Sequence, residues 1–230
     1  MVLSLPQTEL FDFIRIQLRY FFPDRYDLRW ESAKAAFSLA LERVEYSFSH
    51  TTVIGYSDDN GMALFSHLHS DQYAQFLYYF SNSLWDLSEN KPICDKLICL
   101  NKALNGYFFS YKCKLPDIFL FAHPIGSIIG NAGYSDFLVI SQNVTINTGA
   151  NQGSELLPQL GKGLFLGAGA KIIGREPIGD RVSIGVDAVV YGQAVPDDKV
   201  VERTPAGEII VRDRRKQTCA AQQYFNIEIK

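Results

Sequence analysis

The sequence predicts a mainly β protein of the α+β class, in which an all-helical N-terminal domain leads into a parallel β-helix of hexapeptide repeats. Two observations carry this prediction. Aliphatic residues recur every six positions in the second half of the chain, and apolar residues recur at helical spacing in the first half. A period of six matches neither the helical repeat nor the two-residue repeat of a strand, and it is typical of hexapeptide coils.

The six-residue period is clearest from 160 to 201. The first position of every block is aliphatic, at Leu160, Leu166, Ile172, Ile178, Ile184 and Val190. Glycine follows four of these residues, as expected where the backbone turns a tight corner. We expect each aliphatic side chain to point inward and to stack on its equivalent one coil away. The alternative, a run of Gly-rich hairpins, does not require anchors that stay in phase.

The same spacing extends backwards to Ile140 and Ile146. The β-helix is therefore predicted from about Leu115 to Val201, which is room for about four to five coils. The distance from Ile146 to the next anchor, Leu160, is fourteen residues, which is two more than two blocks of six. We therefore expect a loop to bulge from the coil at 151–158.

Four amphipathic helices are predicted before the β-helix, at 8–22, 30–48, 70–87 and 92–104. Pro23 ends the first helix, because its ring is incompatible with a helix interior. Ser70 is expected to cap the third helix, and Asn105-Gly106 to close the fourth. The aromatic runs in these helices are assigned to the core, with a helix–helix contact between copies as the alternative.

These patterns divide the chain into a helical domain at 1–110, a β-helix domain at 111–205 and a C-terminal tail at 206–230. The tail begins where the six-residue pattern fades. It carries a basic cluster at Arg212, Arg214, Arg215 and Lys216. We interpret this cluster either as part of a solvated tail or as a contact for the phosphates of a bound nucleotide.

The composition excludes several classes of function. The chain has 230 residues, a net charge of −3 and no basic stripe, so nucleic acid is not an expected partner. It has no apolar run of about 18 residues and no basic segment before an apolar run at its start, so neither a membrane span nor a signal peptide is expected. The four cysteines form no CxxC pair. Zinc is therefore not expected, and four free thiols fit a cytoplasmic location.

His123 is the candidate catalytic residue. The chain has four histidines, and His123 is the one within the predicted coils, in the segment FAHPIGSIIGN. Imidazole titrates near neutral pH, so histidine is the plainest base for making an acceptor hydroxyl nucleophilic. A structural histidine is the alternative. A single histidine does not supply the ligands of a catalytic zinc, so no metal is expected.

Together these residues resemble the serine acetyltransferase branch of the hexapeptide acyltransferases. In that family a DHATG or DHPxG segment carries the catalytic histidine, and Ala122-His123-Pro124-Ile125-Gly126 matches it here. The following family blocks match 139–146, 147–150 and 157–174. In the last of them, GAGAKIIG differs from the family pattern by one aliphatic exchange. The resemblance covers about 114–205.

The resemblance implies a left-handed β-helix and acetyl-CoA as co-substrate. It also implies a homotrimer or a dimer of trimers, with active sites between neighbouring β-helices. In the implied mechanism His123 takes the proton from an acceptor hydroxyl as that hydroxyl attacks the thioester, and a backbone N–H near Gly149 stabilises the oxyanion. The pantetheine arm is expected near Gly149, Gly167, Ala168 and Gly169, with Lys171 nearby.

Several departures from the family pattern concern the acceptor and the base. Ala122 stands where the family has Asp, Leu157 where it has a second His, and Glu155-Leu156 where it has Asp-Arg. The family Asp that orients the catalytic His aligns with Phe108, and no acid lies close to that position. We therefore expect a backbone carbonyl or another polar group to orient His123.

Three functions remain open at this point. The first is an acetyl-CoA-dependent O-acetyltransferase of the serine acetyltransferase type, acting on a small hydroxyl- or amine-bearing acceptor. The second is a sugar O- or N-acetyltransferase of surface polysaccharide biosynthesis, which the lost serine contacts favour. The third is a non-catalytic trimeric scaffold.

Overall fold

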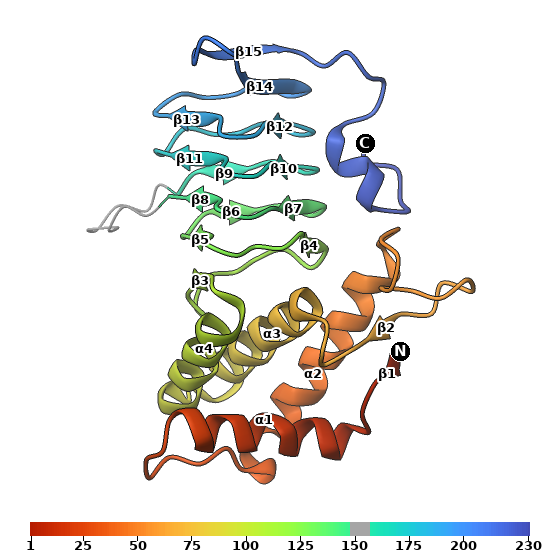
Figure 1. Ribbon diagram of the computed structural model, residues 1–230, viewed down its shortest axis with the longest axis vertical. Helices are drawn as coiled ribbons and strands as arrows, with labels where there is room; N and C mark the ends of the chain where they lie inside the picture. The colour runs from red at the N-terminus through yellow and green to blue at the C-terminus, as the bar shows by residue number, and fades with distance from the viewer. Residues whose placement is uncertain (148–156) are drawn as a thin grey trace.

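The computed structural model describes residues 1–147 and 157–230 and confirms the predicted fold class. Helices gather at one end of the molecule, and short strands stack above them in successive coils (Figure 1). Residues 151–156 of the predicted loop lie outside the described part of the chain.

The helices begin and end within one residue of the predicted positions, at α1 Gln7–Phe21, α2 Trp30–Ser49, α3 Ser70–Ser88 and α4 Lys91–Asn105. Apolar spacing explains this agreement, because each helix buries one face. Gly106 closes α4 in the left-handed region, with φ +68°. The predicted cap of α3 is wrong by one residue: the His69 side chain, not Ser70, accepts from Gln72 N. A short parallel pair, β1 (Val2–Leu3) and β2 (Leu64–Phe65), completes the helical end.

Three parallel sheets form the faces of the coil (Figure 1). The first contains β4 (Phe119–Phe121), β7 (Leu138–Ile140), β10 (Phe165–Leu166), β12 (Ser183–Ile184) and β14 (Lys199–Arg203). The second contains β3 (Phe108–Phe109), β5 (Ile128–Ile129), β8 (Thr145–Ile146), β11 (Lys171–Ile173) and β13 (Val189–Tyr191). The third contains β6 (Gly133–Tyr134) and β9 (Gln159–Leu160), continued by single bridges at Ile178 and Val195.

The six-residue anchors form the interior of the coil, as predicted. Ile140 pairs with Leu166, and Leu166 with Ile184, so equivalent residues of successive coils lie in register. All six predicted anchors from Leu160 to Val190 are at most 2% exposed. The coil begins earlier than the predicted start at Leu115, because β3 already pairs in parallel with β5.

Helix α3 joins the helical end to the first coil. Every residue from Asp71 to Leu84 is buried. Its polar side chains donate to backbone oxygens at the start of the coil: Tyr78 Oη to Cys113 O (3.0 Å), Tyr79 Oη to Asp117 O (3.1 Å) and Gln75 Nε2 to Phe119 O (3.1 Å). The aromatic run of α3 is therefore core, as assigned from the sequence. The same assignment is wrong for the run that ends α1, because Tyr20 is 87% and Phe21 49% exposed.

The last coil is capped, and the chain then returns to the helices. Strand β15 (Ile209–Asp213) pairs antiparallel with β14, and the 3₁₀ helix η1 (Ala220–Tyr224) packs back along the first sheet (Figure 1). The Tyr224 ring stacks on Phe165 at 5.8 Å between centroids. Beyond it, Thr52 N donates to Tyr224 O (2.9 Å) and Asn226 N to His50 O (3.0 Å). The segment predicted as a tail therefore connects the top of the coil to the end of α2.

No helix in the described residues is long and apolar enough to span a membrane.

Replacing Phe225 with alanine should destabilise the fold by about 3–5 kcal/mol, because it removes a fully buried aromatic ring. Phe225 is 2% exposed, and its ring meets Phe137 at 5.3 Å. Urea unfolding followed by circular dichroism measures the change. Ile227, which is 42% exposed, gives the matched control: Ile227→Ala should change the free energy of unfolding by less than about 0.5 kcal/mol. Equal effects of the two substitutions would show that the returning segment contributes no specific packing.

Candidate active site

His123 lies at the corner of the coil between β4 and β5. Its backbone is in the left-handed region, with φ +56°, where non-glycine residues are uncommon. Gly126 completes the corner with φ +76°, and a Cβ at this position would lie 2.1 Å from Asn143 Oδ1 of the next coil. The corner therefore requires glycine at 126 and holds His123 in an unusual backbone conformation.

A buried carboxylate from the helical end meets His123 at this corner. Asp71 lies in the first turn of α3 and is 5% exposed. Its Oδ2 lies 2.8 Å from His123 Nδ1, and the same oxygen accepts from His123 N at 3.1 Å. Of the two expected substitutes for the family acid, a backbone carbonyl or another polar group, the second is present. An aspartate is present, and it comes from 52 residues upstream.

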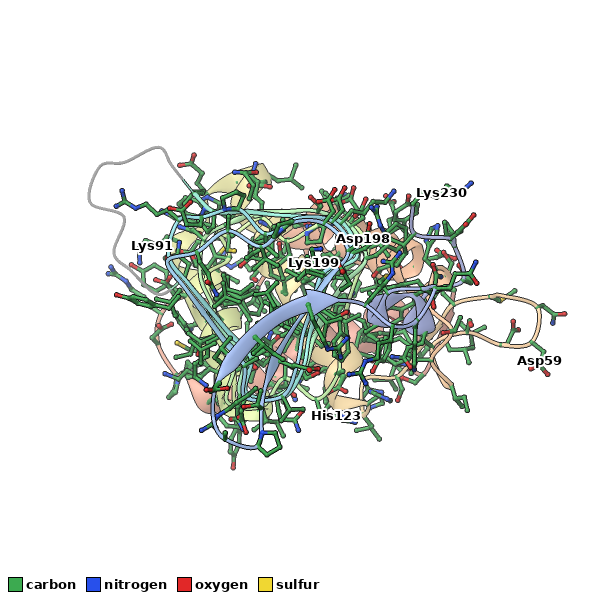
Figure 2. All side chains as sticks on the ribbon, turned by 90° about the horizontal axis from the view of Figure 1, so that it is seen from above. Asp59, Lys91, His123, Asp198, Lys199 and Lys230 are labelled. Atoms are coloured by element: carbon green, nitrogen blue, oxygen red, sulfur yellow. The ribbon has the colours of Figure 1, made fainter. Side chains whose placement is uncertain are left out.

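The contact fixes the orientation of the imidazole. With Nδ1 as the donor to Asp71, the lone pair of a neutral ring is on Nε2. The His123 side chain is 80% exposed, and it lies at the periphery of the molecule when viewed from above (Figure 2). A base held by one nitrogen and open to an incoming group at the other is the arrangement that general-base chemistry needs.

Two buried phenols, Tyr56 and Tyr107, are close enough to Asp71 for its charge to affect them. Burial is the main cause that raises the pKa of Tyr56 and of Tyr107, and the charge of Asp71 adds to it at both. Both phenols therefore stay neutral at physiological pH. Among the described residues, His123 is the one ion-pair partner of Asp71.

Three of the five predicted cofactor-binding residues lie along the same edge of the coil as His123. Gly167, Ala168 and Gly169 form the corner after β10, two strands along the first sheet from β4. At about 4.8 Å for each step, this is about 10 Å. The corner loops bond directly to one another: Asn143 N donates to Ile125 O (2.8 Å) and Gly169 N to Gln142 O (2.9 Å). The structure thus places these three residues and His123 on one edge of the coil.

Lys171 follows this corner and bends back on it, with Nζ donating to Gly169 O at 2.9 Å. A Cβ at Gly169 would lie 2.1 Å from Asp187 Oδ1, so this corner also requires glycine. Gly149, the predicted source of the oxyanion N–H, lies outside the described residues. No cluster of three metal-ligating side chains occurs within 1–147 and 157–230.

A cavity of about 230 Å³ lies directly beside Asp71. Its lining is mostly apolar: Ser70, Asp71, Ala103, Leu104, Asn105, Gly106, Pro124 and Ile125. It lies at the junction of α3, α4 and the His123 corner. A small group bound there would sit next to the carboxylate side of the pair.

Comparison with known proteins identifies the relatives of this arrangement. No protein-family model matches the chain. A serine acetyltransferase of Synechococcus elongatus is 31% identical over 130 residues, which are 56% of this chain and 52% of the relative. That of Escherichia coli is 31% identical over 105 residues, which are 45% of this chain and 38% of the relative. Over these residues the chain is similar in sequence to serine acetyltransferases. It spans about half the length, or less, of the curated relatives it matches.

Solved structures agree on the fold. A serine acetyltransferase of Neisseria gonorrhoeae superposes with a TM-score of 0.66 at 20% identity, covering 95% of this chain and 85% of that protein. One from Vibrio cholerae gives 0.65 at 21% identity, covering 83% and 73%. The first comparison includes the helices as well as the coil, because it covers nearly the whole chain.

No local pattern in the sequence marks Asp71 as a site residue. An acid in the first turn of a helix is common, because the helix dipole favours it there. Nothing in its neighbourhood distinguishes it from Asp86, which is exposed on the same helix. The contact with His123 depends on how α3 docks on the coil, and this is a tertiary property.

Replacing Asp71 with alanine should release the His123 ring. In the wild-type protein Nδ1 carries the hydrogen that Asp71 accepts, so the neutral ring should be mainly in the Nδ1–H form. The variant should lose this preference. Long-range ¹H–¹⁵N spectra of the imidazole, at a pH where the ring is neutral, measure the tautomer. Asp86→Ala is the control and should leave the spectrum unchanged. A wild-type ring already in the Nε2–H form would contradict the assignment.

Proposed function

We propose that the chain is an acetyl-CoA-dependent O-acetyltransferase of the serine acetyltransferase type. The observation that carries this proposal is the contact between Asp71 and His123 Nδ1, which leaves Nε2 free at a coil edge shared with Gly167–Gly169. The sequence relatives, which are serine acetyltransferases, support the same reaction class.

The proposed reaction is direct transfer. His123 Nε2 accepts the proton of the acceptor hydroxyl while its oxygen attacks the thioester carbonyl, giving a tetrahedral intermediate and an imidazolium. The Asp71 carboxylate stabilises this imidazolium. When the intermediate collapses, the C–S bond breaks, and Nε2–H returns the proton to the leaving thiolate. The products are the acetyl ester and free CoA. Gly149 N–H stays our prediction for the oxyanion donor.

The donor is proposed to lie along the coil edge. Residues 167–169 place no large side chain over the stacked corners, so an extended pantetheine arm can lie against the backbone there. Lys171 lies beside this corner. The arm would then run parallel to the coil axis and bring its thioester to His123.

We propose that the active form is a trimer or a dimer of trimers. Phe108 and Ile128 pair in the neighbouring strands β3 and β5 and are 45% and 43% exposed in one copy. Neighbouring exposed apolar side chains of this kind are typical of a protein–protein contact. At the other end of the second sheet Tyr191 is 76% exposed. A neighbouring coil would cover these side chains and would enclose the exposed ring of His123.

A second candidate is acetylation of a sugar. Ala122 and Leu157 stand where the resemblance implies acidic and imidazole contacts to an amino acid, and neither side chain can bind an ammonium or carboxylate group. This departure favours an uncharged, hydroxyl-rich acceptor. The third candidate, a scaffold without catalysis, rested on the lack of an acid beside His123 and on the lost acceptor contacts, and Asp71 removes the first of these arguments.

Replacing His123 with alanine should lower the rate of acetyl transfer at least about a hundredfold, because it removes the general base. Release of free thiol from acetyl-CoA measures the rate. Acetyl-CoA binding, measured by calorimetry, should persist in the variant. His50→Ala is the control, because the His50 ring bonds to the carbonyl of Tyr46 at the end of α2. Wild-type turnover in the H123A variant would contradict the proposal.

The acceptor is tested by supplying serine and a panel of amino sugars in the same assay. Thiol release that depends on serine would assign the serine acetyltransferase reaction. Release with a sugar alone would assign the second candidate. The absence of acetyl-CoA binding by the trimer would leave the scaffold.

A further inference from the structure

A cavity lined by cations lies at the far end of the coil from His123. We call it the basic cavity. It has a volume of about 350 Å³ and lies between the outer face of β12, β14 and β15 and the segment that leads into η1. Its charged lining consists of Arg212, Arg214, Arg215 and Lys216. A volume of this size is at the lower end of the range for small-molecule sites.

Only two of the four cationic side chains that line the basic cavity form ion pairs with carboxylates among the described residues. Arg212 pairs with Glu202 at 2.6 Å, and Arg214 pairs with Asp198. Neither carboxylate lines the cavity. Arg215 and Lys216 have no ion-pair partner among the described residues. This cluster is an exception on a chain with a net charge of −3, and its two unpaired cations are available to a ligand.

The cations are on an anchored segment, not on a loose tail. Strand β15 fixes Arg212 on one side of the cavity. On the other side Cys219 is 6% exposed, and Ala220 N donates to Ser183 Oγ at 3.4 Å. Because both ends are held, a ligand would order only the side chains of Arg215 and Lys216, and the entropic cost of binding is correspondingly lower.

The lining also supplies neutral donors. The hydroxyls of Ser183 and Thr218 and the amide of Gln223 line the cavity. Arg212 Nε is buried without a hydrogen-bond partner among the described residues. Guanidinium forks with hydroxyl groups are the usual partners of phosphate oxygens, which accept several hydrogen bonds at once.

We propose that the basic cavity binds the phosphate groups of a small molecule. Two sources share this chemistry: the nucleotide half of an acyl-CoA and a free phosphate or pyrophosphate. Strand β14 lies four strand steps from β4, which at about 4.8 Å for each step is about 19 Å along the axis. An extended pantetheine arm spans a length of this order. Assignment to the donor nucleotide rests on the proposed function, whereas the anion site itself does not.

The experiment is calorimetric titration of the full chain with adenosine 3′,5′-bisphosphate, and separately with inorganic phosphate and pyrophosphate. The test variant carries Arg215→Ala and Lys216→Ala. Both side chains are exposed, so the fold should be retained, which the unfolding midpoint checks. The control carries Arg29→Ala and Lys34→Ala, which remove the same charges from the exposed start of α2. The H123A variant is titrated in parallel.

We expect saturable binding to the wild-type protein, the control and the H123A variant, and at least tenfold weaker binding to the R215A/K216A variant. Binding of the bisphosphate with this pattern would assign the donor nucleotide. Binding of inorganic phosphate or pyrophosphate alone, with the same pattern, would assign a free anion. No saturable binding of any probe, or equal weakening in test and control variants, would overturn the proposal. Because H123A is expected to bind, failure of acetyl transfer is distinguishable from failure of this site.

Discussion

The docking of helix α3 on the first coil is the interaction on which the candidate site depends. Buried tyrosine and glutamine side chains of α3 donate to backbone oxygens at 113, 117 and 119, just before the His123 corner. Such bonds are expensive to leave unmade in a dry interface. They therefore fix the position of the first turn of α3 as well as its middle. Asp71 reaches His123 because the helix that carries it cannot slide or rotate on the coil.

The coil supplies the second constraint, which is a fixed step. Parallel strands lie about 4.8 Å apart, and each coil contributes one corner to the edge that begins at His123. Distances along this edge therefore change in whole steps, through the number of coils between two corners. Residues 167–169 lie two steps from His123 along this edge. A linear molecule bound along the edge would meet its contacts at intervals that the backbone has already set.

The repetitive part of the fold could be predicted from sequence, because it depends on local spacing. The spacing of the aliphatic anchors from Leu160 to Val190 predicts the interior of the coil. The helix ends are predicted by proline, glycine and apolar periodicity. His123 could be selected because a histidine in a coil corner stands out and its segment resembles a known one. What sequence could not give is any pairing between distant elements.

Asp71 and the returning C-terminal segment are of this second kind. The early strand β3 is not, because Phe109 lies six residues before Leu115 and twelve before Phe121, and all three side chains are buried. The sequence after Val201 is polar and irregular, yet Tyr224 and Phe225 pack on rings of the coil. Two isolated aromatic residues in a polar segment are a weak signal, and their partners at Phe137 and Phe165 are far away in the chain.

The returning segment also determines how tall the coil can be. Stacked repeats in general are quasi-one-dimensional, and each unit senses only its neighbours. Here the segment that follows the last strand, β15, forms hydrogen bonds with Thr52 and His50 at the helical end. It therefore connects the last coil directly to the helices. Inserting or deleting one coil would change the distance that this segment must bridge by about 4.8 Å. The length of the returning segment therefore fits only one number of coils, and it couples the stability of the last coil to that of the helical end.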